Sequence, residues 1–262
     1  MMSAKSAYIV TGTSRGIGKA LAKEVVNRSH LLFSVSRSSG TEVEEERHFR
    51  CDLSDAAQVD QTAEALSREI PLHSIQRLVL VNNAGVLNPI APLERMNQQQ
   101  IATLMQVNFV APVFLMAAFM RISGSFEGKS GIINISSGAA HHPYAGWSLY
   151  CASKAALEMV TACASMEQRS GGHPLYMAAV APGVVETGMQ EEIRNSRNSD
   201  FPMRSKFIAM QKSGDLADPA MVARQLLDLD STGQFDAGGI YDLRDVVLKD
   251  GCPTIVAKSV IK

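Results

Sequence analysis

The sequence predicts an α/β fold, a single-domain, doubly wound parallel β-sheet of about seven strands with helices on both faces. Short apolar runs rich in β-branched residues alternate with longer helical patterns from residue 7 to about residue 242. No linker rich in Pro, Gly or Ser and no internal repeat interrupts this alternation. The 262 residues, 46% of them hydrophobic, suffice for one large core. We therefore expect one domain over residues 1–242, followed by a tail, 243–262, to which the sequence assigns no role.

The elements follow in order along the chain. A strand at residues 7–11 leads into a helix from residue 16 to about residue 27. Further strands are expected at residues 31–36, 48–51, 77–82, 131–136, 175–180 and 239–241. Right-handed crossovers between parallel strands then place helices on both faces of the sheet.

Two further segments have unusual patterns. The helix expected at about residues 100–121 is apolar on nearly all sides, which is typical of a helix buried on more than one side, either in the core of the monomer or at a subunit interface. Residues 191–215 are rich in Asn, Ser, Met and Lys and lack a clear period. They form either a mobile flap over a site or a plain surface excursion.

Composition and charge bound the function. A net charge of −1 without long runs of like charge gives no reason to expect nucleic acid or an anionic membrane as partner, so a small-molecule ligand is expected. The N-terminal residues do not read as a signal peptide, and no apolar run approaches the ~20 residues of a spanning helix, which predicts a cytoplasmic protein. The four cysteines are scattered, as is typical of reduced thiols. No metal site is expected, because His141 and His142 lack a third ligand.

A glycine-rich loop, Thr11-Gly12-Thr13-Ser14-Arg15-Gly16-Ile17-Gly18, joins the first strand to the first helix. Its glycines allow a tight turn and let the backbone approach a pyrophosphate, whose charge a helix N-terminus favours. Because Gly-rich turns are common, the signal depends on the place of the loop between strand and helix. It predicts a Rossmann-type dinucleotide site with cofactor contacts from Gly12, Ser14, Arg15, Gly16, Ile17 and Gly18.

The end of the second strand indicates which dinucleotide binds. NAD-specific folds place an acid there for the ribose 2′-hydroxyl, but this chain has Arg37 between two serines. Arg37 and Arg15 together suit a 2′-phosphate, so NADPH is expected rather than NADH. The alternative is that both arginines are ordinary solvated side chains.

Two more strand ends carry polar residues. Asp52 follows the third strand and is expected to accept a hydrogen bond from the adenine amino group. The turn after the fourth strand is expected to place Asn83, Ala84 and Gly85 against the cofactor, with a simple Asn-rich turn as the alternative.

A tyrosine and a lysine supply candidate acid–base chemistry. Tyr150 and Lys154 lie four residues apart, on one face of a predicted helix. An ammonium beside a phenol is expected to lower the tyrosine pKa from its usual value of about 10, which suits a general acid. The pattern is common by chance, and in isolation a packed tyrosine beside a solvated lysine is the alternative.

Five segments occur together in one order: the glycine loop, the Asn-Asn-Ala-Gly turn, Ser136-Ser137 at the end of the fifth strand, the Tyr150/Lys154 pair and Pro182-Gly183. With this set the chain resembles the short-chain dehydrogenase/reductase family from residue 7 to about residue 242. The resemblance implies one NADP-binding reductase domain, and it implies homodimers or homotetramers.

The resemblance also implies a catalytic tetrad of Asn108, Ser137, Tyr150 and Lys154. Tyr150 would protonate a carbonyl oxygen as hydride leaves the nicotinamide, and Ser137 would stabilise that oxygen, with Ser136 as its rival. Lys154 would also hold the nicotinamide ribose, and Asn108 would position a water. Contacts to the nicotinamide carboxamide are expected from Pro182, Gly183, Val185 and Thr187.

Residues 143–152, which include Trp147, resemble the sepiapterin reductase and benzil reductase subgroup in particular. Asp242 falls where sepiapterin reductases place an aspartate for the pterin, although an exposed carboxylate after a strand is the alternative. The substrate residues expected are therefore Ser137, Trp147, Tyr150 and Asp242. The implied reaction is NADPH-dependent reduction of a ketone or vicinal dicarbonyl, with a pterin or an aromatic diketone as substrate. An NADPH-binding regulatory protein on the same fold is the non-enzymatic alternative.

Overall fold

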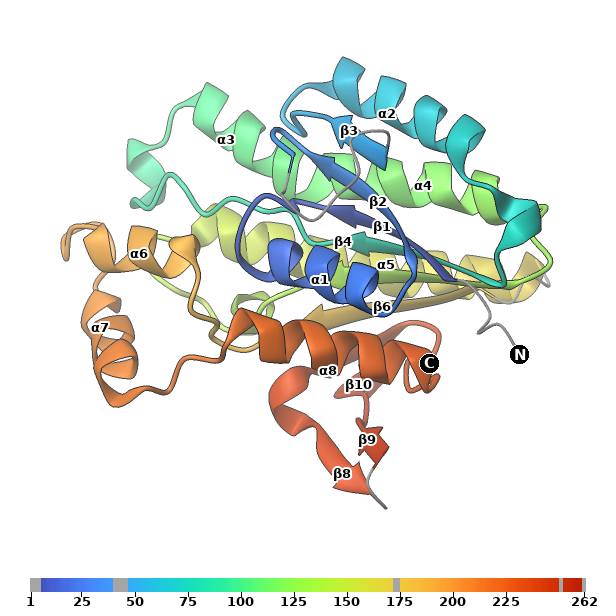
Figure 1. Ribbon diagram of the computed structural model, residues 1–262. Coiled ribbons are helices and arrows are strands. Elements are labelled where there is room, and N and C mark those ends of the chain that lie inside the picture. Colours follow the sequence, from blue (N-terminus) through green and yellow to red (C-terminus); the bar gives the residue numbers. More distant parts are fainter. Residues whose placement is uncertain (1–5, 40–46, 172–174, 250–251, 261–262) are drawn as a thin grey trace.

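The computed structural model describes residues 6–39, 47–171, 175–249 and 252–260. Its main sheet has eight strands in the order β10-β7-β6-β5-β4-β1-β2-β3 (Figure 1). Seven of them are parallel, which confirms the doubly wound sheet predicted from the sequence. These are β1 (Ser6–Thr11), β2 (Leu31–Ser36), β3 (His48–Arg50), β4 (Arg77–Asn82), β5 (Lys129–Ile135), β6 (Leu175–Ala181) and β7 (Gly239–Asp242).

Helices cover both faces of the sheet (Figure 1). On one face lie α1 (Gly16–Asn27) and α8 (Pro219–Ser231), whose apolar side chains form one buried cluster with the strands. On the other face lie α2 (Ala56–Glu69), α4 (Ala111–Ser123) and α5 (Ser148–Gly171), which form a second cluster. Because both faces are covered, the central strands are almost continuously buried, as parallel strands require.

The helix expected at residues 100–121 is interrupted. It consists of α3 (Gln98–Met105), one π-helical turn η4 (Gln106–Val110) and α4. Together, Gln98–Ser123 are long and apolar enough to cross a membrane, with a mean hydropathy of 1.8. In the structure the apolar side chains of α4, such as Phe119, pack into the core against the sheet.

The tail completes the edge of the sheet beside β7. After a short 3₁₀ turn, η6 (Leu243–Asp245), β8 (Val247–Lys249) and β9 (Cys252–Thr254) form a hairpin, and β10 (Ser259–Val260) pairs antiparallel with β7. Ile255 is buried in the same cluster as Tyr241 of β7. Ile255 thus packs onto the α/β core and β10 covers the edge strand β7, in a tail to which the sequence assigned no role.

The strand order reverses between β1 and β4, because β2 lies on one side of β1 and β4 on the other. In open α/β sheets a ligand crevice forms at such a point, beyond the carboxyl ends of the strands. Two short helices, α6 (Gly188–Asn195) and α7 (Arg204–Ser213), stand at this end of the molecule (Figure 1). The segment that had no clear period is therefore largely helical. The remaining short 3₁₀ turns are η2 (Leu72–Ser74), η3 (Leu93–Arg95) and η5 (Gly138–Ala140).

Candidate active site

A cavity of about 490 Å³ opens at the carboxyl ends of the parallel strands. It extends from the glycine loop, past the β4 and β5 ends, to α5, α6 and α7. Of the predicted site residues, these line it: Gly12, Ser14, Arg15, Gly16, Ile17, Arg37, Asp52, Asn83, Ala84, Gly85, Ser137, Trp147, Tyr150, Lys154, Pro182, Gly183, Val185 and Thr187. The sequence predictions thus converge on one cavity, from which three residues, Gly18, Asn108 and Asp242, are absent.

The glycine loop leaves room for a pyrophosphate. Gly12 has a φ of +74°, and a Cβ there would lie 2.9 Å from the Cα of Ala84. A Cβ on Gly18 would lie 2.2 Å from the Gly12 carbonyl oxygen, so Gly18 acts in the packing of the loop and not in the lining. The first turn of α1 has no side-chain cap and no acidic residue. Its free N–H groups and the dipole of the helix fit a phosphate anion.

Hydrogen bonds hold the loop to the neighbouring strands. The Thr11 Oγ1 accepts from the backbone N–H groups of Asn83 and Ala84, each at 3.0 Å, and the Asn83 side chain donates to the Thr11 carbonyl at 2.8 Å. Thr13, which is fully buried, shares hydrogen bonds with the hydroxyls of Ser34 and Ser36. This hydroxyl network was not found from the sequence, because isolated Thr and Ser residues carry no motif.

Three charged residues surround the outer end of the cavity. Arg37 is exposed at the end of β2, and Asp52 lies close enough for its pKa to be lowered, mainly by hydrogen bonds from Ser54 and also by the Arg37 charge. The Arg15 guanidinium lies 3.3 Å from the Glu192 carboxylate of α6. Arg15 and Arg37 therefore border the same cavity, as the sequence predicts.

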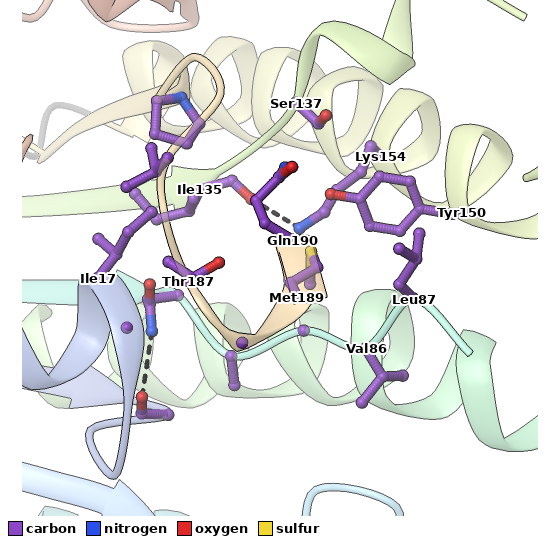
Figure 2. A pocket seen from close by; sticks show the side chains of 18 of the residues that line it. Ile17, Val86, Leu87, Ile135, Ser137, Tyr150, Lys154, Thr187, Met189 and Gln190 are labelled. Atoms are coloured by element: carbon purple, nitrogen blue, oxygen red, sulfur yellow. Dashed lines mark hydrogen bonds between the residues drawn. The ribbon is translucent and has the colours of Figure 1, made fainter. Parts of the chain in front are cut away.

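Ser137, Tyr150 and Lys154 meet in the inner part of the cavity. Figure 2 shows Tyr150 and Lys154 extending from α5 into the same space, with Ser137 nearby. The Lys154 Nζ donates to the Ile135 carbonyl at 2.8 Å and lies 5.9 Å from the centre of the Tyr150 ring. The end of β5 and the first turns of α5 thus bring a hydroxyl, a phenol and an amine together.

The pKa of Tyr150 differs from the sequence prediction. Burial raises the pKa of its hydroxyl above the usual value, although a hydrogen bond with Ser137 opposes the shift. Burial also lowers the pKa of Lys154 to about 8, against the attraction of the Glu158 carboxylate. The prediction that Lys154 lowers the tyrosine pKa is therefore wrong for the protein alone, because both groups are desolvated together.

Asn108 lies behind the cavity, in the π-helical turn η4. Its Oδ1 accepts from the Val86 N–H and its Nδ2 donates to the Val86 carbonyl, both at 2.8 Å, and Nδ2 also approaches the Ser153 hydroxyl at 3.3 Å. These bonds tie the loop after β4 to α5. A π turn is often found at a functional site, where it re-aims one side chain.

Aromatic side chains form the wall toward α6 and α7. Trp147 stacks on Phe201 with ring centres 4.4 Å apart, and Phe207 packs beside both. Two polar atoms of this wall, the Trp147 Nε1 and the Gln190 Oε1, are buried without a protein partner. Gln190 comes from α6 and lines the cavity (Figure 2).

Asp242 does not line the cavity, contrary to the sequence prediction. Its carboxylate is buried and binds the Arg244 guanidinium, at 2.5 Å, and the Lys258 amine, at 2.9 Å. Both hydrogen bonds help to hold the pKa of this carboxyl well below its usual value. Arg244, rather than Asp242, borders the cavity, next to Gly183.

Comparison with known proteins identifies the family. The family model for short chain dehydrogenases matches residues 6–198. The chain belongs to this family. This short-chain dehydrogenase is 34% identical, over 240 residues, to the benzil reductase ((S)-benzoin forming) of Bacillus cereus, which covers 88% of this chain and 96% of that protein. It is 30% identical, over 257 residues, to the sepiapterin reductase of Rattus norvegicus, covering 91% and 96%.

A solved structure of a short-chain dehydrogenase/reductase from Saccharomyces cerevisiae is similar over nearly the whole chain. It covers 95% of this dehydrogenase and 100% of its own chain, with a TM-score of 0.77 and 25% identity. The resemblance noted in the sequence is thus confirmed, and so is membership in a family of oxidoreductases.

Several residues at the short-chain dehydrogenase site were not predicted from the sequence, and three of them matter here. Gln190 and Arg244 line the cavity, and Glu158 lies buried one turn beyond Lys154. Glu158 is spaced four residues from Lys154, a signal that points to one helical face. Gln190 lies on α6 and Arg244 stands two residues after β7, and neither has a spacing signal of this kind.

Proposed function

We propose that this short-chain dehydrogenase is an NADPH-dependent carbonyl reductase that converts a ketone or vicinal dicarbonyl to an alcohol. The observation that carries the proposal is the meeting of Ser137, Tyr150 and Lys154 in a cavity that is continuous with the glycine loop. Similarity to benzil reductases and sepiapterin reductases supports the substrate class.

The residues of the cavity divide the chemistry among them. Bound NADPH would supply a hydride to the carbonyl carbon. Tyr150 would donate its phenolic proton to the carbonyl oxygen, and the Ser137 hydroxyl would stabilise the charge that develops there. Lys154, as an ammonium, would hold the nicotinamide ribose and favour the phenolate left on Tyr150. Asn108 would fix the Val86 loop behind them.

The choice of NADPH over NADH rests on Arg15 and Arg37. Both border the cavity, and the residue that directly follows β2 is Arg37 rather than an acid. Guanidinium groups bind a phosphate through charge-assisted hydrogen bonds, which the 2′-hydroxyl of NADH does not offer. Pro182, Gly183, Val185 and Thr187 would border the nicotinamide, and Asp52 and Asn83 the adenosine half.

An aromatic diketone is the substrate that the wall fits best. Trp147 and Phe207, which both line the cavity, offer apolar aromatic contact for a phenyl group. The carboxylate of Asp242, which a pterin would require, is bound to Arg244 and Lys258. A pterin is the second candidate, because the buried Gln190 Oε1 has no protein partner and would accept a hydrogen bond from a ring N–H.

The test is NADPH oxidation with benzil and with sepiapterin, using wild type and Tyr150→Phe. The variant removes one hydroxyl, and we expect kcat to fall by ~10²–10⁴-fold, the usual value of general acid catalysis. The dissociation constant of NADPH, followed by its fluorescence, should change less than about threefold. A variant that keeps half of the wild-type turnover would remove Tyr150 from the mechanism.

We also propose a second copy of this chain as partner, in a homodimer or homotetramer, and a cytoplasmic location. Exposed apolar side chains on η4 and α5, Val110, Met159 and Met166, support a subunit interface. The free thiols of Cys51, Cys151, Cys163 and Cys252 support a reducing compartment.

A further inference from the structure

A buried carboxylate lies directly behind the catalytic residues. Glu158 is on α5, four residues after Lys154, and its side chain is only 5% exposed. Its Oε1 accepts a hydrogen bond of 2.5 Å from the Ser136 hydroxyl, at the end of β5. Its Oε2 lies 2.9 Å from the Nε2 of His141, which follows η5. One carboxylate thus bonds to the strand end and to the loop on either side of Ser137.

These contacts connect the two parts of the site. Ser137 stands on the segment between Ser136 and His141, whereas Tyr150 and Lys154 stand on α5. Glu158 binds both ends of that segment to the helix. A buried acid is costly unless it is hydrogen-bonded and compensated by charge, so its presence here requires those partners.

The charged groups around Glu158 come from three elements. Lys154 lies on its own helix, His141 follows η5, and Lys258 comes from the tail just before β10. Burial raises the pKa of Glu158, and these three groups oppose that shift by favouring the ionised carboxylate. Lys258 is itself bound to Asp242 and Asp245. In return, the Glu158 charge favours the ammonium form of Lys154, which burial opposes.

We propose that Glu158 and His141 are positioning residues of the reductase, which align Ser137 with Tyr150 and keep Lys154 in its ammonium form up to mildly alkaline pH. His141, whose side chain is 47% exposed, connects the buried Glu158 carboxylate to solvent. This inference rests on the proposed carbonyl reduction. It predicts the pH at which kcat/KM begins to fall on the alkaline side of the pH profile, which is called the alkaline limb below.

The test compares Glu158→Gln, His141→Ala and the double variant with wild type. The matched control is Glu167→Gln, an exposed glutamate on the same helix. With benzil and NADPH, kcat/KM is measured from pH 6 to pH 9. Glutamine keeps the shape of Glu158 but removes its charge, so the alkaline limb should move to lower pH by about one unit. At pH 8.5 we expect a ~10-fold loss, against less than about threefold at pH 6.

His141→Ala should shift the limb in the same direction by a smaller amount, because Glu158 loses its contact with the imidazole and becomes more open to solvent. In the double variant, loss of His141 should add less than about twofold to the effect of Glu158→Gln, since both act through one carboxylate. Glu167→Gln should retain the wild-type profile. A pH-independent loss in Glu158→Gln, or profiles that all superimpose on wild type, would overturn the proposal.

A second readout separates this inference from the proposed function. The dissociation constant of NADPH, measured by fluorescence across the same pH range, reports on Lys154 even if no tested carbonyl is reduced. Glu158→Gln should weaken NADPH binding at pH 8.5 more than at pH 6. Equal changes at both pH values would overturn the inference while leaving the reductase proposal intact. If Glu158→Gln does not fold, His141→Ala, at a half-exposed position, carries the same test.

Discussion

The ammonium of Lys154 is buried in the folded protein, which disfavours its charge. The free-energy cost of burying this charge can be measured without substrate or cofactor. The Lys154 side chain is buried, and burial lowers the pKa from 10.5 to about 8. One unit of pKa corresponds to about 1.4 kcal/mol, so at neutral pH the buried ammonium destabilises the fold by about 3 kcal/mol. Lys154→Met removes the charge and keeps an apolar chain of similar length.

The sign of the pH dependence follows from the lowered pKa. Below about pH 8 the ammonium is present in the folded and unfolded states, and the penalty acts in full. Between about pH 8 and 10.5 the folded state loses the proton first, so the penalty disappears as pH rises. Wild type should therefore gain about 2 kcal/mol relative to Lys154→Met between pH 7 and pH 9.5.

Other contacts reduce the absolute gain of the variant at pH 7. The Ile135 carbonyl loses its donor, which costs about 1–3 kcal/mol. We therefore expect Lys154→Met to equal or exceed wild type in stability at pH 7, by up to about 2 kcal/mol, and to fall below it near pH 9.5.

Denaturant unfolding of the unliganded protein at several pH values measures this difference. Lys23→Met, at an exposed position on α1, is the control and should show no such trend. Parallel stability curves for Lys154→Met and wild type from pH 7 to pH 9.5 would show that the lysine is not desolvated as the structure indicates.

Two other substitutions test the outer site and the tail. Arg37→Asp should invert the cofactor preference toward NADH. The 2′-phosphate of NADPH loses a charged hydrogen bond worth ~1.5–3 kcal/mol and is repelled by the new carboxylate. If the ratio of kcat/KM for the two cofactors stayed equal to that of wild type, this placement of the phosphate would be excluded. Asp242→Asn should destabilise the fold by about 1–3 kcal/mol at pH 7, less than a fully buried pair, because Arg244 and Lys258 are 61% and 44% exposed. Since the pKa of Asp242 is lowered in the folded protein, the difference in unfolding free energy between wild type and Asp242→Asn should persist above about pH 4 and vanish as the pH falls further. Equal denaturation midpoints for the two proteins at pH 7 would refute this prediction.

The strands could be predicted because a strand buried on both faces is a continuous apolar run, which can be recognised in the sequence without knowing what packs against it. β1, β2 and β4 begin and end within one residue of the predicted bounds. The α6–α7 region has no such signal, because its helices are short and largely polar. Ile193 and Phe207 pack on Trp147, which is far away in sequence. This packing stabilises the two helices, whose local sequence pattern does not predict them.

Site residues were found by type and spacing, whereas their partners were not. Tyr150 and Lys154 share a face as a four-residue spacing requires, but their pKa values depend on burial, which spacing does not report. The π turn at Asn108 was missed for a related reason. Its extra residue is stabilised by bonds to Val86, across the fold, and not by the helix itself.

Asp242 shows how a correct position can be assigned the wrong role. Strand β7 ends close to the cavity, which Arg244 lines two residues further on. The Asp242 carboxylate, however, turns to Arg244 and to Lys258 from the tail. Arg244 then packs its stem over Gly183, where a Cβ would come within 3.2 Å of its Cγ. The Asp242 carboxylate therefore does not border the cavity itself but binds Arg244, which does. The cavity has a guanidinium at its β7 edge where the sequence predicted a carboxylate. That guanidinium can donate hydrogen bonds to oxygen atoms of a substrate but cannot accept one from a ring N–H, which is the role expected of the carboxylate.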